Sequence, residues 1–447
     1  MSITQENAPQ NPRSLMVQDA RIAKRHRSER RFRMLGRGAI ILGLLALAML
    51  LTTILSNGLS AFRQTYIQLE VTLPADRLDP TGTRDRAEMA RVTSFGYAPL
   101  LAEAMRDAMA EYGINIDGLS EKQAGDIVSR DAPNQLRNFV LDNPQVLGQR
   151  VAFEFLASSR VDGYMKGRVT MESAERDSQI APEQLMLVDA LIAQGVVEKR
   201  LNWAFLTNPD ASEQRPEAAG MGVAIIGSAY MMLVVLVLAL PLGVATSIYL
   251  EEFAPKNRWT DLIEVNISNL AAVPSIVFGI LGLSIFINFA GLPQSAPIVG
   301  GLVLTLMTLP TIIIATRAAL RAVPPSIRDA ALGLGASRLQ SVFHHVLPLA
   351  APGILTGTII GLAQALGETA PLMLIGMVAF VREFPDAPPA GLFDPASALP
   401  VQIYNWTQRA DPAFFERASG AIIVLLGFLL LMNAVAIVLR RRFERRW

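Results

Sequence analysis

The chain contains 447 residues, of which 51% are hydrophobic and 18% are charged, and its formal net charge is +1. A near-neutral chain has no basic surplus to favour a nucleic-acid partner, and the absence of cysteine excludes disulfides, thiolate metal sites and cysteine nucleophiles. The composition is typical of a membrane protein that carries one soluble portion.

The amino-terminal part combines a basic segment with a long apolar stretch. Residues 38–59 are apolar and numerous enough to cross a bilayer, which needs about 20 such residues. Residues 1–37 are rich in arginine, which favours a cytoplasmic amino terminus. A cleaved signal peptide is the competing interpretation, but the polar region is long and no small-x-small cleavage site follows it convincingly. We therefore predict an uncleaved anchor helix with a basic cytoplasmic tail before it.

The next portion, residues 60–219, has an ordinary globular composition and predicts an α+β domain outside the cytoplasm. Alternation of apolar and polar residues indicates a half-buried strand over residues 67–73. Helices are expected over residues 99–112 and 182–205, and short strands over residues 151–155 and 167–171. No GxSxG or HExxH motif and no histidine occurs in this portion. We expect its charges to form a solvated face, with a ligand-sensing pocket as the alternative.

Residues 220–439 form a core that contains five further apolar stretches. These stretches cover residues 222–248, 267–286, 297–315, 353–378 and 418–439. The arginine-rich tail of residues 440–447 is a second indication of the same topology, with both termini and the loop of residues 317–350 in the cytoplasm. The predicted fold class is an α-helical polytopic membrane protein with about six transmembrane helices. One is the anchor, five form the core, and an α+β extracytoplasmic domain is inserted between them.

The loop of residues 317–350 is polar and helical in character, although it lies between two apolar stretches. It contains Asp329-Ala330-Ala331, then Gly335, and later Leu347-Pro348, a pattern that resembles the cytoplasmic EAA loop of ABC-importer permeases. The resemblance implies that these six residues couple the chain to a separate ATPase. Small alanines allow close helix approach, Gly335 relaxes the backbone between two short helices, and Leu347-Pro348 is expected to end the second helix.

Two positions depart from the family pattern. Asp329 replaces the usual glutamate but keeps its charge and capping ability, and His345 stands where an apolar residue is usual. An ordinary interfacial amphipathic loop is the alternative interpretation of this segment.

The chain itself contains no sequence pattern for an ATP site. A P-loop needs Gly-Lys followed by Ser or Thr, and none of the five lysines follows a glycine. The pair Gly333 and Gly335 lacks the third glycine of a dinucleotide fingerprint. His344 and His345 are adjacent and point in different directions on a helix, which makes them a poor metal pair. We therefore expect no enzyme activity, cofactor or metal in this chain, and ATP and Mg bound by a partner ATPase.

Four strings narrow the resemblance further. The string AQALGETAPLML (residues 363–374) is accompanied by LAAVPSIVFG (270–279), LAAPGILTG (349–357) and LPVQIYNW (399–406). Together they resemble the A-type permease subunits of phosphate ABC importers (PstA), here in a form with an extra amino-terminal domain.

The resemblance implies a multi-pass subunit of the bacterial inner membrane that forms half of a translocation path. Its implied partners are membrane lipid, a second permease (PstC-type), two ATPase subunits (PstB-type) and a periplasmic phosphate-binding protein (PstS-type).

The expected translocation path of this chain comprises Gln364, Glu368 and Thr369. A carboxylate about fifteen residues into a span is costly unless it is paired, protonated or facing a wet cavity, so Glu368 is a functional candidate. Direct contact with phosphate would be repulsive, and we expect Glu368 to orient an arginine or to act as a neutral donor. A structural interhelical hydrogen bond is the alternative. Gln364, one turn earlier, stands where the family often has an arginine, so the partner permease is expected to supply most positive charge.

Two other functions remain open from the sequence. A permease for another oxyanion, such as sulfate, molybdate or phosphonate, would keep the loop and the fold but change the cavity. A membrane-anchored sensor would explain the anchor and the outside domain, but it predicts a cytoplasmic signalling domain after the spans, and none precedes Trp447.

Overall fold

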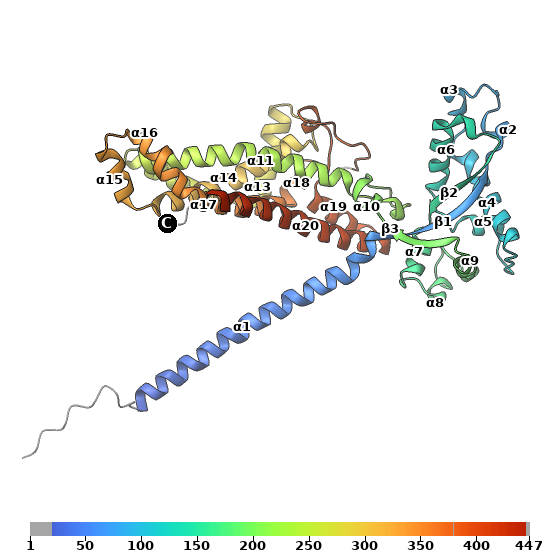
Figure 1. The fold of residues 1–447 in the computed structure, drawn as a ribbon, viewed down its shortest axis with the longest axis horizontal. Coiled ribbons are helices and arrows are strands. Elements are labelled where there is room, and N and C mark those ends of the chain that lie inside the picture. Colours follow the sequence, from blue (N-terminus) through green and yellow to red (C-terminus); the bar gives the residue numbers. More distant parts are fainter. Residues whose placement is uncertain (1–19, 379, 444–447) are drawn as a thin grey trace, which may run out of the picture. The chain divides into compact units, whose positions relative to one another are not determined.

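The computed structural model describes residues 20–378 and 380–443, so parts of the two basic tails, residues 1–19 and 444–447, lie outside the described residues (Figure 1). The chain divides into two compact units, residues 1–56 and 57–447. Among the described residues, five helices are long and apolar enough to cross a membrane, or six if one sharply bent pair counts as a span. This confirms the predicted fold class. The first such helix, α1 (Ala20–Gly58), contains most of the predicted anchor.

A three-stranded antiparallel sheet organises the residues that follow α1, and we call residues 63–202 the sheet domain. Strand β1 (Arg63–Thr72) lies between β2 (Arg150–Leu156) and β3 (Val197–Leu201). Ile67, Leu69 and Val71 are at most 2% exposed because they alternate onto the apolar face of the sheet. Helices α4 (Ser94–Glu111), α6 (Ala132–Asp142) and α9 (Pro182–Ala193) share that hydrophobic core. The strands predicted at residues 67–73 and 151–155 and the helix at residues 99–112 are confirmed.

Shorter elements complete the sheet domain. They are α2 (Ala75–Leu78), α3 (Arg86–Met89), α5 (Glu121–Gly125), η2 (Pro144–Val146), α7 (Ser159–Met165) and α8 (Met171–Ala174).

Two predictions within the sheet domain are wrong. The strand expected over residues 167–171 is a turn, because Gly167 has φ +76° and Thr170 caps the short helix α8. The helix expected over residues 182–205 ends at Ala193, because Gly195 adopts φ +73° and terminates it. The residues after Gly195 pair with β1 as strand β3, so the apolar spacing beyond Ala193 belongs to a strand.

The residues between the sheet domain and the membrane helices form short elements. These are η1 (Leu59–Phe62), α10 (Ala204–Thr207) and η3 (Pro216–Ala218). The helical core then contains α11 (Gly222–Ile248), a π segment η4 (Tyr249–Phe253), α12 (Arg258–Ala271), α13 (Ser275–Leu281), a π segment η5 (Gly282–Phe289), α14 (Pro297–Arg321), α15 (Pro325–Gly333), α16 (Arg338–Ser341), a π segment η6 (Val342–Val346), α17 (Leu347–Leu366), α18 (Ala370–Leu374), η7 (Ala390–Leu392), α19 (Leu399–Gln408) and α20 (Pro412–Phe443).

Small residues let the long helices of the core approach closely. Helix α14 packs against both α11 and α17, and α20 packs against α17. A Cβ atom built on Gly357 of α17 would lie 2.2 Å from the Cβ of Ala315 on α14. Nearer the amino end of α14, Gly301 lies against Val234 of α11. Contacts of this kind replace the hydrophobic effect as the force that joins helices inside a bilayer.

Two predicted spans are not continuous helices. The stretch over residues 267–286 is bent by 103° between α12 and the α13–η5 segment, because Pro274 cannot continue the preceding helix. The stretch over residues 353–378 is broken after Leu366, because Pro371 lacks an N–H and its ring would clash with the carbonyl of Gly367. The helices that follow the two breaks, α13 and α18, pack against each other.

Candidate functional site

The segment between α14 and α17, residues 322–346, is called the helical loop, and it lies at the end of the bundle where α15 and α16 are labelled (Figure 1). Helix α15 ends in a turn in which the N–H of Ala336 donates to the carbonyl of Ala331 at 3.0 Å. Gly335 has φ +89°, a conformation that favours glycine. Ser337 then starts α16 with a capping box that it shares with Gln340. The predicted change of helix at Gly335 is confirmed.

The prediction that Leu347-Pro348 ends the second helix is wrong. Helical backbone continues without a break from Arg338 to Leu366. A π segment, Val342–Val346, ends two residues before Pro348. Because hydrogen bonding there already departs from the α-helical pattern, the missing N–H of Pro348 is tolerated. The helical loop is therefore continuous with the membrane helix α17.

The helical loop exposes large apolar side chains. Asp329 and Ala330 are exposed on α15, whereas Ala331 is buried against the rest of the core. Four apolar side chains are between 43% and 90% exposed, namely Leu332, Leu334, Leu339 and Phe343. A cluster of exposed apolar side chains on a polar loop is typical of a protein interface.

An ion-pair network, which the sequence analysis missed, attaches the helical loop to the end of α11. Arg328 donates to Glu252 with an Nη2–Oε1 distance of 2.6 Å, and it also donates to the carbonyls of Leu320 and Val323. Glu251 accepts from Arg321 at 2.8 Å. The sequence offers one hint, a pair of carboxylates directly after an apolar span and several arginines at the end of the later span and in the loop that follows it.

A third arginine of this network binds α12. Arg317 donates to Glu264 at 2.5 Å and contacts Glu251 at 3.4 Å. The carboxylates of η4 and α12 therefore meet arginines that lie more than 50 residues later in the chain, at the base of the helical loop.

The three residues of the expected path lie at the break between α17 and α18. Gln364 is exposed on the last turn of α17, and Glu368 and Thr369 are half-buried beyond its end. The expectation that Gln364 precedes Glu368 by one turn of the same helix is wrong, because α17 ends at Leu366, between them. Among the described residues, no hydrogen bond or ion pair joins the Glu368 carboxylate to another side chain.

Irregular backbone at membrane depth is tolerated only where it is buried in protein or lines a water-filled cavity. The break before α13 leaves Pro274 exposed in this chain, and the break before α18 leaves Gly367 exposed. At membrane depth, we expect such exposed backbone to be covered by a partner protein or to line an aqueous path. The most apolar stretch of α20 is only 6% buried within this chain. Its backbone is regularly helical, so this stretch can face lipid without a covering partner.

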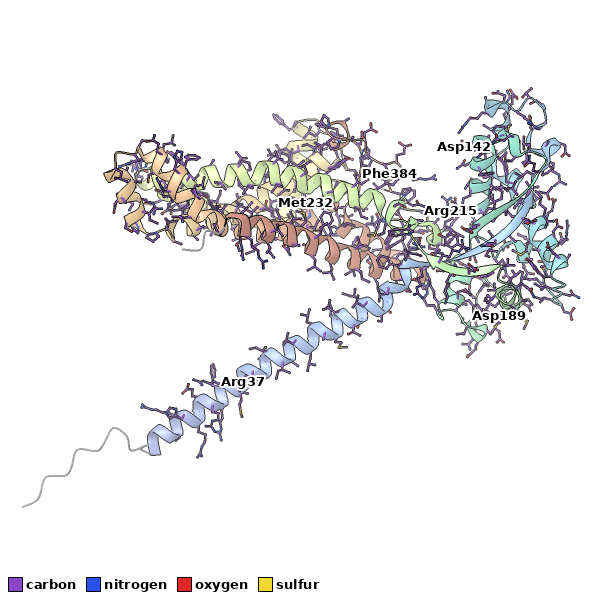
Figure 2. All side chains as sticks on the ribbon, viewed as in Figure 1. Arg37, Asp142, Asp189, Arg215, Met232 and Phe384 are labelled. Atoms are coloured by element: carbon purple, nitrogen blue, oxygen red, sulfur yellow. The ribbon has the colours of Figure 1, made fainter. Side chains whose placement is uncertain are left out.

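A nearby groove does not suit an anion. It has a volume of about 250 Å³ between α11, α17 and α20, and it is lined by apolar side chains such as Met232, Leu362 and Met432 (Met232 is labelled in Figure 2). Within residues 20–378 and 380–443, no group of three or more His, Asp or Glu side chains could hold a metal ion.

Comparisons with known proteins match both parts of the chain. Residues 239–447 match the family of "binding-protein-dependent transport system inner membrane component" proteins, and residues 19–175 match a domain of unknown function, DUF3333. A probable ABC transporter permease of Bacillus subtilis, YqgI, is 33% identical over 261 residues, which are 56% of this chain and 86% of that protein. The phosphate transport system permease protein PstA 1 of Mycobacterium tuberculosis is 33% identical over 231 residues, which are 51% of this chain and 73% of that protein.

Proposed function

This chain belongs to the family of binding-protein-dependent ABC transporter permeases, and from that premise we propose that it is a permease subunit of an inorganic phosphate importer. As a permease component it is not itself an enzyme, and ATP is bound by a partner ATPase. Phosphate is supported by the GETAPL string and by the identity to a PstA protein.

The observation that carries the proposal is the helical loop. It exposes apolar side chains on two short helices joined at Gly335, and it continues directly into α17. A force on the loop is therefore delivered to a membrane helix without a flexible link. Asp329, Ala330, Ala331, Gly335, Leu347 and Pro348 form the ATPase-coupling segment in this proposal.

The proposed topology follows from the arginine distribution. Both termini and the loop of residues 317–350 lie in the cytoplasm, and the sheet domain lies outside it. The domain boundaries in this proposal are 1–37, 38–59, 60–219, 220–439 and 440–447.

The proposed path runs past the break that contains Glu368 and Thr369, next to Gln364. A carboxylate with no cation partner in the described chain would repel an oxyanion, so the second permease subunit supplies the positive charge. Two ATPase subunits and a phosphate-binding protein complete the assembly.

Reconstitution tests the substrate. The chain would be placed in proteoliposomes with its second permease and its ATPase, loaded with internal ATP, and given the binding protein outside. We expect ATP-dependent uptake of labelled phosphate, and no uptake with a Walker-lysine variant of the ATPase. ATP-dependent uptake of sulfate or molybdate without phosphate uptake would replace phosphate by another oxyanion and leave the assignment as a permease intact.

A further inference from the structure

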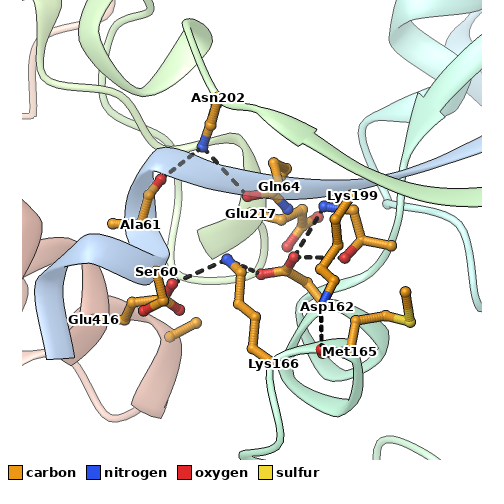
Figure 3. A network of polar contacts seen from close by, with 12 residues as sticks. Ser60, Ala61, Gln64, Asp162, Met165, Lys166, Lys199, Asn202, Glu217 and Glu416 are labelled. Carbon is orange, nitrogen blue, oxygen red and sulfur yellow. Dashed lines mark hydrogen bonds and ion pairs between the residues drawn. The ribbon is translucent and has the colours of Figure 1, made fainter. Parts of the chain in front are cut away.

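The first turns of α20 carry two charged residues that are buried against the sheet domain. Glu416 and Arg417 are each 4% exposed, although they stand at the beginning of a membrane helix. Figure 3 shows Glu416 close to Lys166, which follows α7 and also contacts Asp162. A buried charge is costly without a partner, so the partners of these two residues identify what the arrangement does.

Glu416 is held by two cations of the sheet domain. Its Oε1 accepts from Lys166 Nζ at 2.9 Å, and its Oε2 lies 2.5 Å from Arg168 Nη2. Lys166 also contacts Asp162 at 2.6 Å, and Asp162 accepts from both the N–H and the hydroxyl of Thr65 on β1. The charge on α20 is thus tied through α7 to the central strand of the sheet.

Arg417 holds the segment that leads from the sheet domain to α11. It donates to the carbonyls of Glu217 at 2.6 Å and Ala219 at 2.7 Å, and to Gln64 Oε1 at 3.0 Å. We call Asp162, Lys166, Arg168, Glu416 and Arg417 the buried ion cluster.

Close apolar packing surrounds the buried ion cluster. Phe205, Trp406 and Phe414 are fully buried in one hydrophobic group that joins α10, α19 and α20. A Cβ built on Gly420 would lie 2.7 Å from the Cβ of Ala61. A second ion pair, Arg409 with Asp210 at 2.5 Å, joins α19 to the same connecting segment.

From this geometry we propose that the sheet domain is fixed rigidly to the amino end of α20 and moves with it as one body, rather than swinging as a hinged lid. Separation of the two would break these ion pairs and expose the apolar side chains packed around them, which favours one closed arrangement. Helix α20 packs along α17, and α17 is continuous with the helical loop. Motion of the loop is therefore transmitted through α17 and α20 to the sheet domain. This inference rests on membership of the permease family and is independent of phosphate as the substrate.

Distance measurement between two spin labels tests the rigid connection. The chain contains no cysteine, so Tyr112→Cys in the sheet domain and Tyr404→Cys on α19 label it at two exposed sites. The labelled chain would be assembled with its partners, made free of reactive cysteines, in nanodiscs. We expect one narrow distance distribution that is the same without nucleotide and with trapped ATP. A shift between the two states that exceeds the width of the distribution would overturn the proposal.

Substitution of Glu416 tests whether the buried ion cluster is responsible. We expect Glu416→Gln to broaden the distance distribution, because Lys166 and Arg168 lose the charge they share. Glu172→Gln is the matched control, because Glu172 pairs with Arg176 on the surface with both side chains more than 75% exposed. If Glu416→Gln does not assemble, Arg168→Gln provides a milder change, since Arg168 is 29% exposed. An unchanged narrow distribution in whichever variant assembles would show that the cluster does not hold the domain.

Discussion

Arg328 and Glu252 are 76 positions apart in sequence, yet their side chains form an ion pair with three donor–acceptor contacts of 2.6 to 3.2 Å. The pair joins α15 of the helical loop to the π segment that ends α11. Arg328 also caps two carbonyls at the end of α14. The loop is thereby attached to two membrane helices at its first turn and to a third, α17, at its last.

Arg328→Gln is expected to uncouple transport from ATP hydrolysis. The Arg328 side chain is 22% exposed and that of Glu252 is 11% exposed, so removal of one partner leaves a mostly buried charge at a cost of roughly 2–4 kcal/mol. We expect ATP hydrolysis by the assembled complex to continue while uptake falls about tenfold. Uptake and phosphate release from ATP would be measured on the same proteoliposomes. Arg258→Gln, at an exposed position of α12, is the control, and an equal loss in both variants would contradict a specific role of Arg328.

Gly335→Ala is expected to weaken ATPase binding. A residue with a Cβ atom at φ +89° carries strain of about 1–2 kcal/mol, so the turn between α15 and α16 shifts. Gly333→Ala is the control, because that glycine is the last residue of α15 and its built Cβ has open space. Affinity of the ATPase for the solubilised permease would be measured by microscale thermophoresis. Equal affinities for the two variants would contradict a requirement for the left-handed turn.

Local patterns were sufficient to predict the strand at residues 67–73 and the long helices α11 and α14, because alternation and apolar length are properties of contiguous residues. They were insufficient where a proline interrupts an otherwise apolar stretch. The stretch of residues 353–378 met the length criterion for a span, although Pro371 already indicated a break.

The sequence predicted those features of the candidate site that depend on neighbouring residues, and it missed those that depend on distant ones. Gly335 was recognised because a glycine between two helical patterns has a local conformational meaning. The pairing of Arg328 with Glu252 and that of Lys166 with Glu416 join residues far apart in the chain. Only the packing of whole helices decides which charges meet, so one sequence does not specify these partners.

Gly357→Ala is expected to destabilise the contact between α14 and α17. The added methyl group would lie 2.2 Å from the Cβ of Ala315, so the two helices must separate at a cost of about 1–3 kcal/mol. Gly427→Ala is the matched control on α20, because no atom lies within 4 Å of its built Cβ. The midpoint of thermal unfolding in detergent would be compared for both variants. A decrease confined to Gly357→Ala agrees with the packing, and equal midpoints contradict it.

Glu217, which lies in η3 and accepts a hydrogen bond from Ser129 of the sheet domain, is expected to make the stability of the chain depend on pH. Burial raises the pKa of its carboxyl above the ordinary value of 4.5, although Ser129 donates to it at 2.5 Å. Between 4.5 and the raised pKa, the folded chain keeps a proton that the unfolded chain has lost. The stabilisation that the Glu217 carboxyl contributes is therefore complete below pH 4.5. It decreases as the pH rises from 4.5 through the raised pKa of the folded chain.

Glu217→Gln removes the titrating proton and retains an acceptor for Ser129. We expect the midpoint of thermal unfolding of the variant to exceed that of the parent chain increasingly as pH rises above about 5. Glu213→Gln, at an exposed position four residues earlier, is the control and should follow the parent chain. Parallel pH profiles for all three proteins would contradict a proton held by Glu217.

Glu368→Gln is expected to lower phosphate uptake without loss of assembly. Glu368 lies at the break after α17, half-buried and without a hydrogen-bonding side chain among the described residues, so its partner in the working complex comes from another subunit or from water. Loss of a charge-assisted contact of about 1.5–3 kcal/mol corresponds to a decrease of roughly 10- to 100-fold. Uptake would be measured in proteoliposomes that contain equal amounts of assembled complex. Glu383→Gln, in the exposed connection between α18 and α19, controls for a change of charge alone. Unchanged uptake by a fully assembled Glu368→Gln complex would show that Glu368 is not part of the translocation path. The break after α17, with its exposed Gly367, would then be the remaining feature for a partner to cover.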